Sequence, residues 1–162
     1  WDLSNVTQTS HMFCGAKIFN QPLKSWDVSN VTDMTAMFKW AGAFNQSLNN
    51  WDVRSAILMN SMFVGAKTFN QPLNNWNTSN VTNMHHMFNA AYLFNQPLNN
   101  WNTSNVTNMS YMFYEARNFN QPLNNWDVSH VTNIAGLFCQ TAFNQPINNW
   151  NVNSVTNMMF MF

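Results

Sequence analysis

The chain carries the stretch Phe119-Asn120-Gln121-Pro122-Leu123-Asn124-Asn125-Trp126-Asp127-Val128-Ser129, and the rest of the sequence repeats it or fills the gap to its next copy. Tryptophan marks the repeat at Trp1, Trp26, Trp51, Trp76, Trp101, Trp126 and Trp150, a spacing of 25 residues five times and 24 residues once. Self-similarity at such a period is typical of solenoids and propellers. We therefore expect residues 1–162 to form a single repeat solenoid, whose coils start near these tryptophans and whose last, partial coil starts at Trp150.

Charged residues make up only 7% of the chain, and six basic side chains cancel six acidic ones. This balance provides no electrostatic footprint for nucleic acid, which we exclude as a partner. Asparagine supplies the polarity with 31 residues, and 15% of the chain is aromatic. Recurrent Trp, Phe, Met and Leu can form a core, so disorder is excluded as well. No run of 18 apolar residues occurs, and we expect no membrane insertion within this segment.

The segment from Leu23 to Val28 has the Leu-x-x-Leu-x-Leu spacing that begins a leucine-rich repeat, with tryptophan in one slot. In an extended segment Trp26 and Val28 point inward together, whereas Asp27 points outward. Asparagine is a poor strand former, so we expect each coil to contribute only one short parallel strand. The stacking of neighbouring coils has to stabilise that strand.

The residues after this segment predict a short helix. Ser29-Asn30-Val31-Thr32 offers side-chain oxygens suited to capping it. Apolar residues then fall within one arc of a helix of about three turns, at Val31, Met34, Met37, Phe38 and Ala41. The predicted fold is an α/β solenoid: a leucine-rich-repeat-like, right-handed stack of about six coils, each with a short parallel strand and a short helix.

A phenylalanine follows each predicted helix and is itself followed by Asn-Gln in every copy, as at Phe44-Asn45-Gln46. We expect the two amides to bond the backbone of their own and neighbouring coils, because stacked turns have peptide groups that need partners. We also expect a buried ladder formed by Trp26, Trp51, Trp76, Trp101 and Trp126. Trp40 lies outside this ladder and should be more exposed.

Three motifs that recur along the whole chain carry a resemblance: Trp-Asp-Val-Ser-Asn-Val-Thr, Met-Phe-x-x-Ala and Phe-Asn-Gln-Pro-Leu. The sequence resembles the bacterial surface protein repeat, which is grouped with the BspA-type leucine-rich repeats and occurs in lipoproteins and wall-linked proteins of mycoplasmas and listeriae. Related arrays occur in some protists and large DNA viruses. The resemblance implies an extracellular or cell-surface array, or one on a virion surface, that serves adhesion or protein binding. It transfers no catalytic or ligand residue.

The sequence offers no constellation for catalysis or metal binding. No nucleophile, base and orienting acid meet on one repeat, so we expect a protein that is not an enzyme. The pair His85-His86 has no cysteine or carboxylate clustered with it. Asp27 gives way to Asn77 in the same slot, and a calcium ligand would not readily exchange its charge for neutrality. We therefore predict no catalytic residues, no metal site and no cofactor.

Two functions stay open. The first is a non-enzymatic, surface-displayed repeat scaffold for adhesion, whose partner is a protein or glycan on another surface. Its candidate partner-facing strand ladder comprises Asp27, Asn50, Asp52, Asn75, Asn77, Asn100, Asn102, Asn125, Asp127, Asn149 and Asn151. The second is a purely structural spacer, fibre or shell component of a cell surface or virion, whose partners are neighbouring copies in an assembly.

Variation between repeats bears on that choice. The outward triplets of the ladder barely change, whereas the outer face of the predicted helix varies most, as at Lys39-Trp40, His85-His86 and Tyr111. The helix side is therefore an equal candidate for contact with a specific partner. Neither end of the array has a polar cap, and Met158, Met161 and Phe162 occupy ordinary apolar slots. We expect a fragment of a longer chain that continues past both ends, or a second chain docked there.

Overall fold

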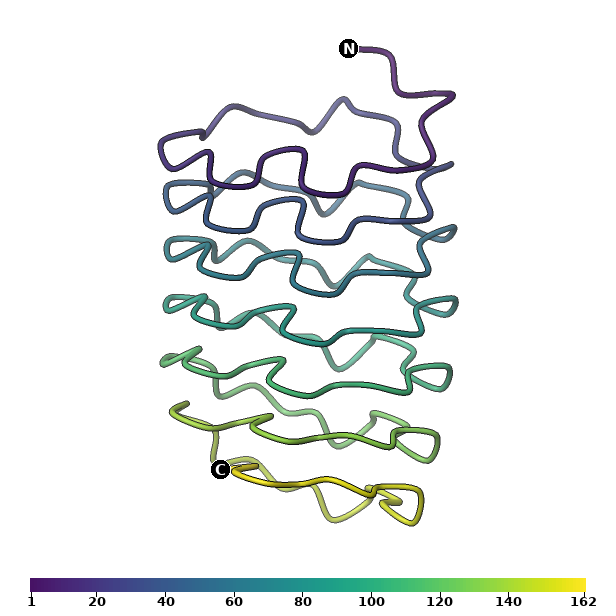
Figure 1. The fold of residues 1–162 in the computed structure, drawn as a ribbon, viewed down its shortest axis with the longest axis vertical. Coiled ribbons are helices and arrows are strands. Elements are labelled where there is room, and N and C mark those ends of the chain that lie inside the picture. The colour runs from purple at the N-terminus through teal and green to yellow at the C-terminus, as the bar shows by residue number, and fades with distance from the viewer.

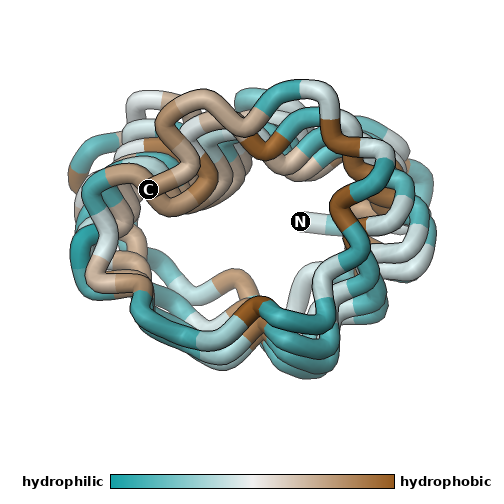
Figure 2. The backbone as a smooth tube through the Cα atoms, turned by 90° about the horizontal axis from the view of Figure 1, so that it is seen from below, coloured by the Kyte–Doolittle hydropathy of each residue, from teal (hydrophilic) through white to brown (hydrophobic).

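Coils that each span one sequence repeat lie one above another along the long axis of the molecule, with the N- and C-termini at opposite ends (Figure 1). The computed structural model describes residues 1–162. Seen along the long axis, each coil makes one turn around a common centre, and successive coils superimpose (Figure 2). The tandem repeat of the sequence is therefore also a repeat of the structure.

Six isolated parallel bridges join seven successive coils at one position of the repeat. They connect Gln8, Asp33, Leu58, Asn83, Asn108, Asn133 and Asn157 in a single column. Backbones paired in this way lie about 4.8 Å apart, so each coil advances the stack by about that distance. None of the 73 backbone hydrogen bonds belongs to a helix or an extended strand.

The prediction of strand-plus-helix coils is wrong, because the structure contains no helix and no strand beyond these single bridges. The segment predicted to be helical in the second coil, residues 31–41, forms no helix, and its residues 34–41 are a series of turns that we call the turn run. Its amides alternate between two kinds of partner. Ala36 donates to the Asn60 carbonyl of the next coil, whereas Met37 donates to Met34, three residues earlier. Half of the amides therefore connect coils rather than closing helical turns.

Two slots of each turn run adopt the left-handed backbone that usually ends a helix. In the second coil these are Ala36, with φ 53°, and Trp40, with φ 62°. The corresponding slots of the other coils are occupied by His11, Gly15, Ser61, Gly65, His86, Ala90, Tyr111, Glu115, Gly136, Gln140 and Phe160. A left-handed residue every fourth position interrupts any right-handed helix.

The spacing of the coils explains why a helix is excluded. An α-helix with its side chains is about 10 Å across and packs at about 8–10 Å from a parallel neighbour. These coils stack at about 4.8 Å, and Figure 1 shows no strong curvature that would spread them on one side. The inward face was nevertheless predicted correctly: Val31, Met34, Met37, Phe38 and Ala41 are all fully buried.

Turns also replace the predicted strand from Leu23 to Val28. The Trp26 amide donates to the Leu23 carbonyl at 3.0 Å, so this backbone bonds within its own coil. The bridges lie instead at Asp33 and its equivalents, inside the segment predicted to be helical. Asparagine, aspartate and serine favour turns because their side chains bond nearby backbone groups. That chemistry is the physical reason why a sequence rich in these residues forms no strand here.

The residues predicted to cap the helix connect coils instead. Asn30 donates its side-chain amide to the Ser4 carbonyl at 2.7 Å, and the Thr32 hydroxyl donates to the Thr7 carbonyl at 3.2 Å. Both acceptors lie in the preceding coil. Polar side chains thus supply coil-to-coil bonds where a sheet would have used its backbone.

Aromatic rings stack in columns through the interior. One column has ring centroids between 5.5 and 6.0 Å apart and comprises Phe38, Phe63, Phe88, Phe113 and Phe138. A second column, with spacings between 6.0 and 6.3 Å, comprises Phe44, Phe69, Phe94, Phe119 and Phe143. These distances suit offset stacking and fix the register of each coil on the next.

The burial predicted for the tryptophan ladder is confirmed at four of its five positions. Trp51, Trp76, Trp101 and Trp126 are buried, and Trp26 is half-buried. Trp40 is 47% exposed, as expected for a residue outside the ladder. The buried indoles each donate to a leucine carbonyl one coil away, as Trp76 does to Leu48 at 2.9 Å. Each indole N–H therefore has the partner that its burial requires.

An asparagine ladder forms beside the phenylalanine columns. The Asn45 side-chain oxygen accepts the backbone N–H of Asn70 at 3.0 Å and the side-chain amide of Gln71 at 3.2 Å. The same pair of bonds recurs between later coils, as at Asn70 with Asn95. The expectation that these amides bond neighbouring coils is confirmed, although the glutamine bonds a side chain rather than the backbone.

Candidate functional site

The candidate partner-facing residues lie on turns, since the strand that was predicted to carry them does not form. All eleven are exposed except Asp52, which is half-buried. Those in the aspartate slot close a local turn: the Asp27 carboxylate accepts the Ser29 N–H at 3.0 Å, and Asn77 does the same for Ser79 at 3.1 Å. The slot therefore accepts aspartate or asparagine, because either side chain provides the oxygen.

Two aspartates of this slot, Asp27 and Asp127, are stabilised in their charged form. Hydrogen bonds from the side chain and backbone of Ser29 lower the pKa of Asp27, and Ser129 lowers the pKa of Asp127 in the same way. A donor that bonds the carboxylate favours ionisation. These carboxylates consequently present fixed negative charges at neutral pH.

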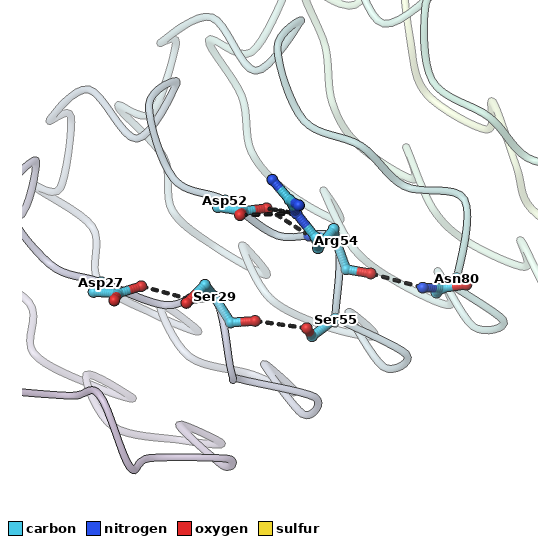
Figure 3. Close-up of polar contacts among 6 residues, drawn as sticks. All are labelled: Asp27, Ser29, Asp52, Arg54, Ser55 and Asn80. Carbon is cyan, nitrogen blue, oxygen red and sulfur yellow. Dashed lines mark hydrogen bonds and ion pairs between the residues drawn. The ribbon is translucent and has the colours of Figure 1, made fainter.

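The candidate surface contains a hollow of about 590 Å³ where the third coil meets the fourth. Four of the predicted residues line it, namely Asn50, Asp52, Asn75 and Asn77. Arg54 lines it too and forms an ion pair with Asp52, with its Nε 2.9 Å from the carboxylate (Figure 3). The hollow therefore combines amide groups with one paired cation.

Hydrogen bonds to neighbouring coils hold this surface in place, as Figure 3 shows. The Ser55 hydroxyl donates to the Ser29 carbonyl at 2.6 Å, and the Asn80 side chain donates to the Arg54 carbonyl at 2.7 Å. Residues Arg54 and Ser55 are thus bonded to the coils on either side. Such a surface presents its polar groups with little freedom to rearrange.

A second hollow lies over the turn runs and was not identified from the sequence. It measures about 450 Å³ and is lined by His86, Asn89, Tyr111, Tyr114, Cys139 and Phe160. His86 stacks on Tyr111 with ring centroids 4.9 Å apart, and a Cβ atom on Gly136 would approach the Tyr111 ring to 2.4 Å. A glycine that follows an aromatic residue by one repeat is the sequence signal that reveals this arrangement.

The histidines beside this hollow are neutral at physiological pH. Burial, followed by the nearby charges of His85 and Lys39, lowers the pKa of His86 from 6.5 to about 4. Burial also lowers the pKa of His85, although its bond to the Ser110 backbone opposes the shift. His85 Nδ1 lies 2.7 Å from the Ser110 hydroxyl, and Asn89 bonds His86. The two rings are packing and hydrogen-bonding groups in this geometry.

No group of three or more His, Cys, Asp or Glu residues is arranged to hold a metal ion. The structure also contains no helix long and apolar enough to cross a membrane.

The chain matches the family described as "Mycoplasma protein of unknown function, DUF285" over residues 1–96 and 70–162. Searches of the curated proteins and of the solved structures find no match. The two matched ranges overlap and together span the whole chain, in agreement with its tandem repeats. The finer assignment to BspA-type leucine-rich repeats is not part of that match. The chain belongs to the mycoplasma-type DUF285 repeat family.

Proposed function

We propose that this protein is a non-enzymatic repeat scaffold displayed on a cell surface, where it binds a protein or glycan partner for adhesion. The observation that carries the proposal is the hollow bordered by Asn50, Asp52, Arg54 and Asn75. It is large enough for a small ligand or a protruding side chain. Its location on the cell surface rests on the resemblance to bacterial surface repeats.

The physical case rests on preorganisation. The ladder repeats exposed amides and carboxylates about every 4.8 Å along the stack. Coil-to-coil bonds such as Asn80 to Arg54 fix the backbone that carries these groups. A ligand that accepts and donates hydrogen bonds would meet partners already in place and would lose little affinity to ordering the protein.

A structural spacer, fibre or shell component remains the second candidate. The observation that favours it is the uniform asparagine ladder, in which Asn45, Asn70 and Asn95 bond the next coil. Side chains occupied in this way serve the regularity of the stack, and regularity is what a spacer requires. A spacer would bind no specific partner through either surface.

A glycan array and a surface-protein pulldown separate the two candidates. The test variant combines Asn50→Ala with Asn75→Ala, because both side chains line the hollow and are exposed. The matched control combines Asn100→Ala with Asn125→Ala, which occupy the same slots without a hollow. Loss of a ligand in the first variant alone supports the proposal. If the unmodified chain captures nothing, or if both variants bind equally, the spacer is favoured.

A further inference from the structure

The indole of Trp40 lies flat on the surface of the turn runs, over the next coil. A Cβ atom on Gly65 would come within 2.2 Å of the Trp40 ring, so the ring occupies the space that any side chain there would need. Trp40 remains 47% exposed, whereas Gly65 is buried beneath it. The side of the indole that lies over Gly65 is therefore covered, and about half of the residue is open to solvent.

Two of the four glycines in the chain, Gly42 and Gly65, line a hollow together with this ring, and Gly15 occupies the Trp40 slot one coil earlier. Gly65 has to lack a side chain because the Trp40 ring occupies that space, and both Gly15 and Gly65 have positive φ. Gly42 differs, because its backbone is ordinary and a Cβ atom would meet only the Lys17 carbonyl, at 3.8 Å. No steric constraint explains a glycine there. Its effect is to leave an open surface beside the indole, which we call the floor of the hollow.

Two lysines border that floor. Together with Trp40, Gly42 and Gly65, Lys17 and Lys67 line a hollow of about 320 Å³. Lys17 and Lys67 occupy the same slot two coils apart, which separates their backbones by about 10 Å. Both are exposed, and neither belongs to the two ion pairs of the chain, Arg54–Asp52 and Arg117–Glu115.

Charge is unevenly distributed around each coil, although the chain is neutral overall. Four of the six basic residues follow or lie within the turn runs, namely Lys17, Lys39, Lys67 and Arg117. The acidic residues lie elsewhere in the repeat except Glu115, which pairs with Arg117. The surface around Trp40 is therefore positive, and it contains no carboxylate to neutralise Lys17 or Lys67.

We propose that this hollow binds a carboxylated saccharide, with a sugar ring on the open face of Trp40 and its carboxylate between Lys17 and Lys67. The C–H groups of a pyranose carry slight positive charge and suit the negative face of an indole. Ammonium groups on both sides bond the carboxylate through charge-assisted hydrogen bonds. This site rests on the proposed binding function and deepens it by naming a ligand class. It is separate from the hollow bordered by Asn50 and Asn75.

A nucleic acid is the competing ligand for an aromatic ring beside lysines, and the surroundings argue against it. Strand binding needs a continuous row of free cations and stacking platforms. Here Arg117 is engaged by Glu115 and lies 4.5 Å from the Tyr92 ring centroid, and the Lys67 ammonium lies 5.6 Å from the same centroid. The contact of Lys67 with the ring is weak and leaves its N–H donors unpaired, so the cations able to bond an anion are confined to the few coils around Trp40.

The test follows the indole N–H signals of the purified chain by NMR during titration. The probes are a hexasaccharide of alternating glucuronic acid and N-acetylglucosamine, sialyllactose, and the carboxyl-reduced hexasaccharide. Ladder indoles from Trp51 onward are bonded to leucine carbonyls, whereas the Trp40 indole has no such bond. A Trp40→Phe variant identifies its signal. We expect an acidic probe to shift the Trp40 signal and the reduced probe to have no effect.

Three variants then test the geometry. Lys17→Gln with Lys67→Gln should weaken binding at least tenfold, and the matched control Lys24→Gln should not. Gly42→Ser has room for its side chain and keeps the fold, yet it should block the floor and abolish binding. The inference is overturned if neither acidic probe binds at millimolar concentration, if the reduced probe binds equally, or if single-stranded DNA binds more tightly. If Asn50→Ala with Asn75→Ala leaves all binding unchanged while the Lys17→Gln with Lys67→Gln variant loses it, only the first proposed site, the hollow at Asn50 and Asn75, is contradicted.

Discussion

Replacing Trp76 by alanine should strongly destabilise the stack. The side chain is 3% exposed, its ring lies 6.1 Å from that of Trp101, and its indole N–H donates to the Leu48 carbonyl. Truncation of a buried tryptophan costs about 3–5 kcal/mol. It would also remove one of the two donors to the Leu48 carbonyl, which keeps the Trp51 N–H at 3.0 Å, and a lost hydrogen bond of this kind costs about 0.5–1.5 kcal/mol. We therefore expect a loss of about 5 kcal/mol in the free energy of unfolding.

Such a loss is comparable with the total stability of many domains, about 5–15 kcal/mol, so the alanine variant can unfold altogether. Trp76→Phe provides a milder measurement, because phenylalanine retains a stacked ring and removes only the N–H donor and part of the volume. The expected cost is about 1–3 kcal/mol, from the lost indole hydrogen bond and the smaller ring, since the Leu48 carbonyl keeps the Trp51 N–H. The ordering of the two variants tests the hydrogen bond separately from the packing.

Urea denaturation followed by tryptophan fluorescence and near-ultraviolet circular dichroism measures both variants. Trp40→Ala is the matched control, because this indole is half exposed and should contribute less than about 1 kcal/mol. A cost below about 1 kcal/mol for Trp76→Ala, or one equal to that of the control, would refute the conclusion that the buried Trp76 side chain stabilises the core. Equal costs for Trp76→Phe and Trp76→Ala would refute the separation of hydrogen bond from packing.

Three further outcomes are expected. Asn70→Ala should lower the free energy of unfolding by about 1–3 kcal/mol in urea denaturation, because two donors of the next coil lose their acceptor. Asn70→Asp keeps the acceptor oxygen and should cost less; equal costs would show that the asparagine ladder does not stabilise the stack. Because the fold lowers the pKa of His86 to about 4, the free energy of unfolding should fall as pH drops from about 6.5 to about 4. The fall should be smaller in His86→Gln; identical pH profiles would show that His86 does not cause it. Gly136→Ala should be destabilising because its Cβ atom would meet Tyr111, and thermal unfolding should show a smaller loss when Tyr111→Ala is also present; simple additivity would show that the ring does not cover the glycine.

The sign of the pH prediction follows from linkage. A base whose pKa is lower in the folded state leaves stability unchanged when both states are neutral, above about pH 6.5. Below that pH the unfolded chain takes up a proton that the folded chain refuses, so folding becomes less favourable until about pH 4. The aspartates act in another window: the lowered pKa of Asp27 stabilises the fold above about 3.8 and loses that effect only at lower pH. The two contributions can therefore be separated by titration.

The sequence predicted the repeat and its inward face because both depend only on spacing. Met34, Phe38 and Ala41 are buried whether they belong to a helix or to a run of turns, since both conformations bring residues three or four apart to the same side. Backbone conformation depends on what lies in the neighbouring coil, which local periodicity does not reveal. Ala36 and Trp40 gave no sign of their positive φ, because neither residue type favours it.

The candidate site was predicted in part for a related reason. Exposed asparagine and aspartate slots such as Asn50 and Asp52 were visible as the polar side of the repeat. The hollow that joins them depends on the distance between coils and on the position of Arg54, which only the three-dimensional structure provides. The pairing of Trp40 with Gly65 was present in the sequence as a large residue followed by glycine 25 positions later. Repeat proteins can be searched for that pairing, because a ring that crosses to the next coil requires a vacant slot there.

The two kinds of slot explain how one repeat can be both uniform and varied. A slot such as Asn70 bonds the coil on either side, through its backbone N–H to Asn45 and through its side-chain oxygen to Asn95 and Gln96, so a change of side chain there leaves two donors of the next coil unpaired. A left-handed slot of the turn run carries its side chain on the outside, while its backbone amide supplies the coil-to-coil bond, as at Trp40 with Val64. Left-handed geometry costs an ordinary residue about 1–2 kcal/mol whatever its side chain, so His, Ser, Tyr and Trp can replace one another there at similar cost. Recognition can therefore diversify on the turn runs without weakening the stack.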